Sequence, residues 1–110
     1  MEEKKIQELQ ILEQNLHNLL LQKQAFQMEL SETDNALKEI EKTDDEVFKI
    51  IGNLMIKKSS SEVKKELSNK QKILNMRIKN IEKQESSFSE KIEEFRKEFM
   101  KSMDEKKNKS

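Results

Sequence analysis

Apolar residues recur in alternating steps of three and four along the first forty residues. The positions are Leu9, Leu12, Leu16, Leu19, Lys23, Phe26, Leu30, Thr33, Leu37 and Ile40. Eight of these ten are apolar, and the residues between them are mostly Glu, Gln, Lys and Asn. This spacing keeps one apolar stripe on one helix face and is typical of a coiled-coil seam. It predicts a helix from about residue 3 to 42, with the stripe widened in places by Ile11, Leu20, Leu21 and Met28.

A second stripe of the same kind follows after residue 60. Its positions are Leu67, Gln71, Leu74, Ile78, Ile81, Glu85, Phe88, Ile92, Phe95 and Phe99. Ser59, with Glu62 three residues later, has the spacing of a capping box, which marks the start of a helix. The pattern predicts a helix from about residue 60 to 105, and the Lys-rich residues 106–110 are expected to fray.

The two stripes match when the helices run antiparallel. One register places Phe26 opposite Ile78 and also brings together two polar interruptions, Thr33 and Gln71. Lys23 fits the seam less well, but its aliphatic stem can lie along apolar residues while the ammonium group reaches water. We therefore predict one domain over residues 1–110, a long antiparallel helical coiled-coil hairpin of the mainly α class.

The stretch VFKIIGNLMIKK, residues 47–58, differs from both helices. It holds the only glycine, Gly52, between two short runs of β-branched and large apolar residues. Glycine at the first central position suits a two-residue type II′ turn. The sequence thus predicts a β-hairpin over residues 46–58, in which Ile51 faces Leu54, Ile50 faces Met55 and Lys49 faces Ile56.

Both faces of this hairpin are largely apolar, although an isolated two-stranded hairpin is only marginally stable in water. Its unpaired edges also invite strand addition by another chain. We therefore expect strands of other chains to complete the hairpin. The predicted oligomer interface is Val47, Phe48, Ile50, Ile51, Gly52, Leu54, Met55 and Ile56. The alternative is that these residues pack onto the ends of the chain's own helices.

Composition supports helices with a thin apolar seam and argues against several functions. Charged residues make up 40% and hydrophobic residues 33%; 22 basic residues balance 22 acidic ones, and cysteine and proline are absent. We expect no membrane span, no nucleic-acid partner, no cofactor and a cytoplasmic location. His17 has no second His or Cys to share a metal, and no catalytic motif occurs, so we expect no metal site and no enzyme. Glu66 and Lys70, four apart, are expected to pair on the helix surface.

The central segment resembles a known family. The residues ALKEIEKTDDEVFKIIGNLMIKK, at 36–58, are similar to the helix-to-hairpin segment of prefoldin β-type subunits, above all archaeal ones. SEVKKEL and IKNIEKQE are similar to the start and middle of that family's second helix. The resemblance implies a hexamer of two α and four β subunits with a double β-barrel body. It also implies an ATP-independent holdase that binds unfolded client proteins and passes them to a group II chaperonin.

In such a chaperone the ends of the coiled coil would bind clients. Both chain ends should lie together there, and α-helical stripes without a partner leave apolar surface for variable ligands. The alternative, favoured for Leu9 and Phe95, is that these side chains only close the coiled coil. The candidate client-binding residues are Ile6, Leu9, Phe95, Phe99, Met100 and Met103.

Two other functions compete with the chaperone. One is a structural coiled-coil scaffold or tether, which would have no need of a Gly-Asn hairpin with two apolar faces. The other is a nucleic-acid-associated helical hairpin, which the chain's balanced charge disfavours. Residues 47–58 therefore discriminate between the functions.

Overall fold

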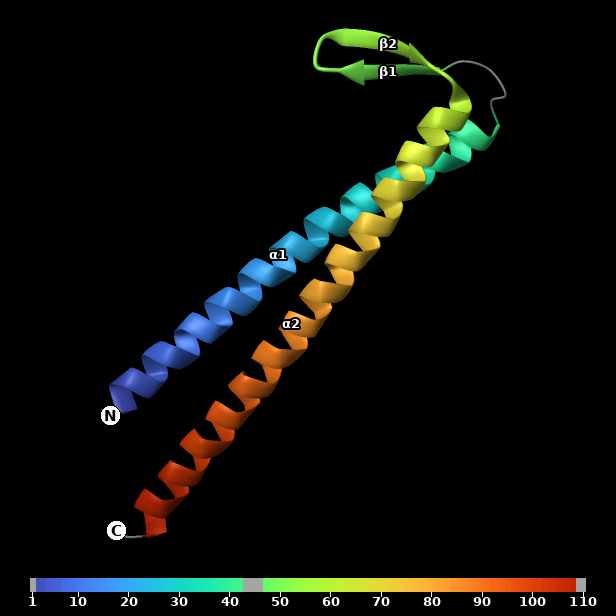
Figure 1. Ribbon diagram of the computed structural model, residues 1–110. Coiled ribbons are helices and arrows are strands. Elements are labelled where there is room, and N and C mark those ends of the chain that lie inside the picture. Colours follow the sequence, from blue (N-terminus) through green and yellow to red (C-terminus); the bar gives the residue numbers. More distant parts are fainter. Residues whose placement is uncertain (1, 43–46, 109–110) are drawn as a thin grey trace. The chain divides into compact units, whose positions relative to one another are not determined.

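The computed structural model describes residues 2–42 and 47–108, which form two helices and two strands (Figure 1). Their order is α1 (Glu2–Glu41), β1 (Val47–Ile51), β2 (Leu54–Lys58) and α2 (Ser60–Asn108). The predicted fold class, a mainly α helical hairpin with a small β-hairpin at the connection, is confirmed. The structure has α2 ending at Asn108, three residues beyond the expected end near residue 105. Residue 46 and residues 109–110, which the predictions also covered, lie outside the described residues.

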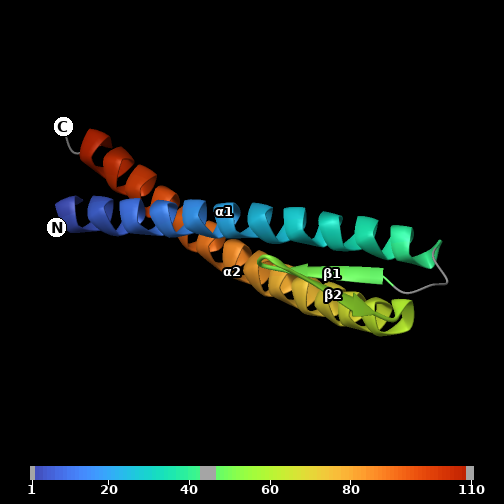
Figure 2. The ribbon, with the colours of Figure 1, turned by 90° about the horizontal axis from the view of Figure 1, so that it is seen from above.

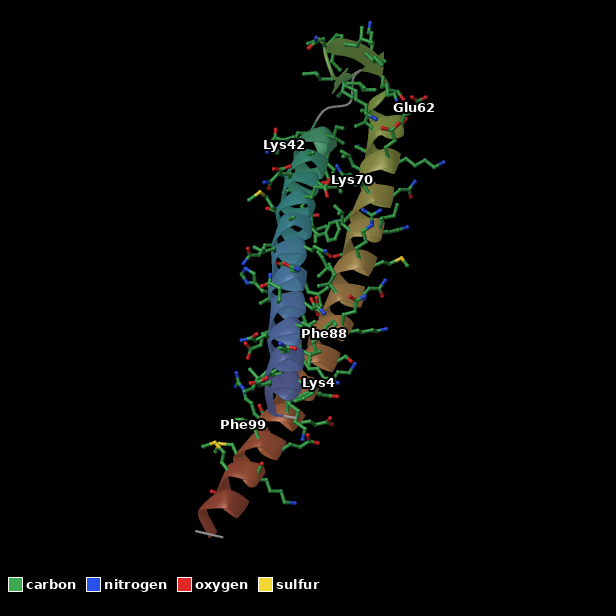
Figure 3. The ribbon with its side chains drawn as sticks, turned by 90° about the vertical axis from the view of Figure 1, so that its left-hand side faces the viewer. Lys4, Lys42, Glu62, Lys70, Phe88 and Phe99 are labelled. Carbon is green, nitrogen blue, oxygen red and sulfur yellow. The ribbon has the colours of Figure 1, made fainter. Side chains whose placement is uncertain are left out.

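The two predicted stripes form the seam between α1 and α2. All ten positions of the first stripe are buried or half-buried, and so are all of the second except Phe99. Figure 3 shows side chains from both helices, Phe88 among them, filling the space between the ribbons. The four residues predicted to widen the first stripe are exposed, so they do not extend its buried part. These exposed residues are Ile11, Leu20, Leu21 and Met28.

The described residues divide into two compact units, one of which is Gln24–Lys79. The polar interruptions of this unit are satisfied. The hydroxyl of Thr33, 3% exposed, donates to the carbonyl oxygen of Glu29 at 2.8 Å. The amide of Gln71 donates to Asp34 Oδ1 at 2.6 Å. Thr33 and Gln71 therefore interrupt the seam at matching positions, as predicted. They do not bind each other, however, because each has a hydrogen-bond partner elsewhere on α1.

The second unit joins the residues up to Lys23 with those from Asn80 onward. Here the ammonium of Lys23 has two acidic neighbours on α2. It lies 3.4 Å from Glu85 Oε1 and 4.0 Å from Glu82 Oε1. The side chains of Lys23 and Glu85 are only 22% and 19% exposed. The two charged interruptions of the seam thus form an ion pair, although Glu85 Oε1 makes no hydrogen bond.

The beginning of α2 is capped as predicted. Ser59 Oγ accepts a hydrogen bond from the backbone N–H of Glu62 at 3.4 Å. The first backbone hydrogen bond of the helix runs from Val63 N–H to the carbonyl of Ser59 at 3.2 Å. Ser59 is therefore the N-cap, and it fixes where the chain leaves β2 and enters α2.

The β-hairpin has the predicted register. Ile51 pairs with Leu54, Ile50 with Met55 and Lys49 with Ile56. Gly52 has a φ of +59°, and no other described residue has a positive φ. A type I′ turn would need positive φ at Asn53 as well, so the turn conforms to type II′ at this angle. The glycine is required because an L side chain is strained at such a φ.

Candidate functional site

The β-hairpin exposes most of its apolar side chains. Phe48, Ile50 and Met55 lie on one face, and the pairing places Ile51, Leu54 and Ile56 on the other. All six are exposed, whereas Val47 is half-buried. The chain's own helices therefore do not cover these six side chains, contrary to the alternative. The hairpin therefore presents two uncovered apolar faces, a feature that marks an interaction surface.

One carboxylate fastens both strands to α2. Glu66 Oε2 lies 3.0 Å from Lys49 Nζ on β1, and Glu66 Oε1 lies 2.6 Å from Lys58 Nζ on β2. In the view of Figure 2 the strands run over the beginning of α2, which carries Glu66. The predicted pairing of Glu66 with Lys70 is wrong, because Lys70 instead lies 3.5 Å from Glu29 on α1.

These contacts shift the ionisation of both partners. The hydrogen bond from Lys58, followed by that from Lys49, lowers the pKa of Glu66. The hydrogen bond to Glu66 raises the pKa of Lys58. Both groups are open to solvent, so their interaction is screened by salt. The carboxylate positions the base of the hairpin without covering its apolar faces.

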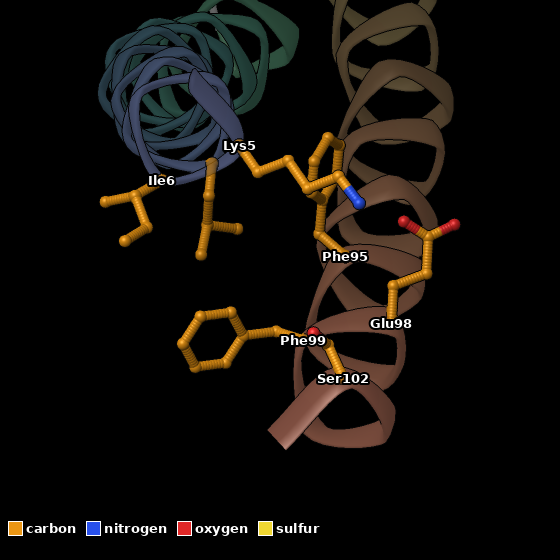
Figure 4. Close-up of a pocket in the computed structure, with 7 residues that line it drawn as sticks. Lys5, Ile6, Phe95, Glu98, Phe99 and Ser102 are labelled. Atoms are coloured by element: carbon orange, nitrogen blue, oxygen red, sulfur yellow. The ribbon is translucent and has the colours of Figure 1, made fainter. Parts of the chain in front are cut away.

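A second apolar surface lies where the first turns of α1 meet the last turns of α2. A groove of about 260 Å³ is lined by Ile6, Leu9, Phe95 and Phe99, with Lys5, Glu98 and Ser102 at its margin. We call these seven residues the terminal groove. Figure 4 shows Ile6 and the Phe99 ring on one side and the charged ends of Lys5 and Glu98 on the other. Ile6 and Phe99 are 42% and 44% exposed, so the groove is open to solvent.

The six candidate client-binding residues do not share one surface. Four of them line the terminal groove, in which Leu9 and Phe95 are half-buried seam residues. Met100 lies instead in a shallow depression among charged side chains, including Arg96 and Lys101. Met103 is exposed and belongs to neither lining. A turn of about 100° per residue explains why Phe99 and Met100 face different ways.

The described part of the chain offers no chemistry for a metal. Within residues 2–42 and 47–108, no three His, Cys, Asp or Glu side chains gather closely enough to hold an ion. His17 is exposed beside the seam residue Leu16. None of the helices in the described ranges is long and apolar enough to cross a membrane. The surfaces that remain as candidate sites are apolar and suit macromolecular ligands.

These features define a class of protein: a helical coiled-coil hairpin whose connection is a β-hairpin with exposed apolar side chains. The family model described as "Prefoldin subunit" matches residues 3–106. The chain therefore belongs to the prefoldin family, a family of chaperone subunits. Its assembly with other prefoldin subunits follows from this membership.

Individual relatives agree with the family. The chain is 36% identical over 90 residues to prefoldin subunit beta of Pyrobaculum calidifontis, covering 80% of this chain and 72% of the relative. It is 35% identical over 91 residues to prefoldin subunit beta of Archaeoglobus fulgidus, covering 81% and 78%. The resemblance to β-type subunits inferred from residues 36–58 is confirmed.

A solved structure has the same fold. The crystal structure of the prefoldin beta subunit from Thermococcus strain KS-1 superimposes with a TM-score of 0.85 at 31% identity. The match covers 91% of this chain and 90% of the other. The beta2 subunit from the same strain gives a TM-score of 0.69 at 18% identity, and that likeness bears on the fold alone.

Proposed function

We propose that the chain is an ATP-independent holdase subunit, one of four β-type subunits that assemble with two α-type subunits. In this proposal the β-hairpins form the body of the hexamer. The terminal groove of each chain holds apolar segments of unfolded client proteins, which pass to a group II chaperonin. The observation that carries the client-binding step is the open groove with its exposed Ile6 and Phe99.

The hairpin supports the assembly step. Six exposed apolar side chains on two strands cost free energy in water, at roughly 25 cal/mol per Å² of apolar surface left uncovered. Further strands would cover the faces and would pair the free edges. The interface would consist of the hairpin residues that the sequence predicted, with Glu66 holding Lys49 and Lys58 at the base.

The size of the terminal groove sets the kind of client contact. A volume of about 260 Å³ is smaller than that of a typical drug-sized pocket and suits one or two apolar side chains. Burying one such side chain gains only about 1.5–3 kcal/mol, so a single groove binds weakly. Several grooves in one hexamer would act together and gain avidity, while each contact still releases the client easily.

The test is suppression of client aggregation by the assembled chaperone. We expect the Ile6→Ser/Phe99→Ser variant to form normal assemblies but to lose most of its holding activity, because the groove loses its two exposed apolar side chains. A control is Met76→Ser, which removes a more exposed apolar side chain, 65% exposed, from α2 outside the groove. This control should retain full activity.

The two exposed methionines test the extent of the site. We expect Met100→Ser/Met103→Ser to weaken holding less than the groove variant does, because neither side chain lines the groove. Unchanged activity of the Ile6→Ser/Phe99→Ser variant would show that the groove does not hold clients. If the methionine variant lost more holding activity than the groove variant, the client-binding site would lie around Met100 and Met103 instead of in the groove.

Light scattering tests the assembly and the competing scaffold. A hexamer-sized particle should appear when an α-type subunit is added. A stable two-chain particle indifferent to that subunit would favour the scaffold instead. The cytoplasmic location remains a prediction of the sequence, to be checked by fractionation of cells that express the chain.

A further inference from the structure

A larger groove than the terminal one lies between β1 and α2. Its volume is about 640 Å³, and Phe48 of β1 forms one wall. Val63, Leu67, Ile73 and Leu74 of α2 supply further apolar lining, and the remaining lining residues are Glu29, Lys49, Glu66, Asn69, Lys70 and Arg77. We call this surface the hairpin groove. Ile73 is 49% exposed, so the apolar floor reaches solvent.

The charged groups around the hairpin groove already have partners within the chain. Glu29 lies 3.5 Å from Lys70, and Glu66 binds Lys49 at 3.0 Å. The guanidinium of Arg77 lies over the ring of Phe26, 5.6 Å from its centroid. Four of the five charged lining groups are thus in ion pairs, which a charged ligand would have to break, whereas Arg77 keeps its charge over the ring. The apolar side chains of the groove suit an apolar segment, and the charged ones surround them as the polar rim surrounds the centre of a protein interface.

Phe48 belongs both to this groove and to the uncovered face of the β-hairpin. The groove is thus continuous with the surface that the proposed function assigns to assembly. The segment that matches it best in chemistry is the hairpin itself, whose turn carries Ile50, Ile51, Leu54 and Met55, all exposed and uncharged. We propose that the hairpin groove receives the β-hairpin turn of a second copy of this chain, an inference that rests on the proposed function.

This contact joins two different surfaces of the same chain. One copy contributes the turn with the strand ends beside it, residues 50–55, and the other contributes the groove on α2, residues 63–77. Such a contact is heterologous, since each copy keeps a free turn or a free groove for the next. Successive copies would therefore all be joined in the same sense, turn to groove. Pairing between two identical hairpin edges would instead relate two copies symmetrically.

Cross-linking tests this contact directly, because the chain has no cysteine of its own. One batch carries Leu54→Cys and a second, of different tagged mass, carries Ile73→Cys. After the two are mixed and oxidised, we expect the disulfide between the batches to form at least tenfold faster than with a Met76→Cys batch. Met76 is an exposed residue of α2 that does not line the groove, so it reports random collision. Equal rates for positions 73 and 76, including the case of a chain that stays monomeric, would overturn the proposal.

Self-association separates this proposal from the proposed function. We expect Ile73→Glu and Ile50→Glu each to lower self-association at least tenfold in sedimentation, with unchanged helix content and with Met76→Glu as the neutral control. If Ile50→Glu blocks association and Ile73→Glu does not, the groove contact is wrong and assembly through the hairpin stands. If Ile50→Glu has no effect, even with an α-type subunit present, the proposed assembly itself fails.

Discussion

The seam and the β-hairpin are both rich in apolar residues, yet the chain treats them in opposite ways. In the seam, nineteen of the twenty predicted positions are at least half-buried, and the polar ones have partners. In the hairpin, six apolar side chains are exposed even though every strand residue is paired as predicted. The seam is completed by its own chain, whereas the hairpin is not.

The difference in burial separates apolar residues that stabilise the fold from apolar residues that are available to partners. Apolar residues that the chain itself covers contribute to stability, and their substitution should unfold the helices. Apolar residues that it leaves uncovered contribute little to the stability of a single chain. They are available to partners, and their substitution should change assembly or client binding while the helices remain folded.

The largest effect should come from the centre of the seam. Leu74 is 2% exposed, and we expect Leu74→Ala to lower the free energy of unfolding by about 2–5 kcal/mol through lost burial and a cavity. Leu54→Ala, which makes the same change at a hairpin side chain 68% exposed, should cost less than about 0.5 kcal/mol. Denaturant unfolding followed by circular dichroism, at a concentration where the chain is monomeric, measures both. Similar losses at the two positions would erase the contrast between seam and hairpin.

The Lys23–Glu85 ion pair in the seam should give the next largest change in the free energy of unfolding. Lys23→Leu leaves the Glu85 carboxylate half-buried without its cation, so we expect a loss of about 1–3 kcal/mol. Lys23→Leu/Glu85→Leu removes both charges and should regain most of that loss. The coupling between the two sites comes from a double-mutant cycle in denaturant.

Additive losses in that cycle would mean that Lys23 and Glu85 do not interact in solution. A suitable control pair is Glu13 and Arg96, whose ion pair of 3.8 Å is far more exposed. Its coupling should lie below about 1 kcal/mol, as is usual for surface pairs.

A smaller effect is expected at the turn. Gly52→Ala places a Cβ at a φ of +59°, where nothing lies within 4 Å, so the cost is backbone strain rather than a clash. We expect about 1–2 kcal/mol of lost hairpin stability. Amide hydrogen exchange should speed up in residues 47–58 and stay unchanged in the seam. Faster exchange in α2 as well would show that the hairpin stabilises the helix. That result would contradict the view that the seam is stable without the hairpin.

The smallest effect concerns pH at the base of the hairpin. Because its folded-state pKa is lowered, Glu66 contributes stability above its usual value of 4.5, and this is lost as pH falls through the folded-state pKa. Lys58, with a raised pKa, contributes below its usual 10.5 and loses this as pH rises through its folded-state pKa. The attachment of the strands to Glu66 should therefore hold between pH 4.5 and pH 10.5 and weaken outside this range.

Carboxyl titration by NMR measures the pKa of Glu66. A pKa at or above 4.5 would contradict the contact with the two lysines, and Glu66→Gln should remove the dependence of stability on acid pH.

The sequence was sufficient for the seam and for the hairpin register because both depend on local periodicity. Alternate steps of three and four define a helix face, and Gly52 defines the turn from which the strand pairs are counted. The N-cap at Ser59 is equally local. These elements could be assigned without knowing where any distant residue lies.

The charge partners could not be assigned in this way. Glu66 binds Lys49, which is 17 residues away, in preference to a lysine one helical turn away. The Lys23–Glu85 contact depends on how far two side chains reach across the seam. In both cases several pairings satisfy the sequence, and only the packed structure selects one of them.

The lining of the terminal groove was predicted in part. Leu9, Phe95 and Phe99 follow from the stripe, and the structure adds Lys5, Glu98 and Ser102 at the groove margin. No sequence pattern singles out these three polar residues, because polar positions are common on both helices. The hairpin groove was missed altogether, since Phe48 and Ile73 meet only once β1 lies against α2.

The shared carboxylate of Glu66 has a consequence for how such chains evolve. Replacing either Lys49 or Lys58 removes one contact and leaves the other strand attached, so drift at each lysine is tolerated while the other remains. Replacing Glu66 removes both contacts at once. Among descendants of this chain, Glu66 should be retained longer than Lys49 or Lys58. Where Glu66 is lost, both strands should carry compensating changes.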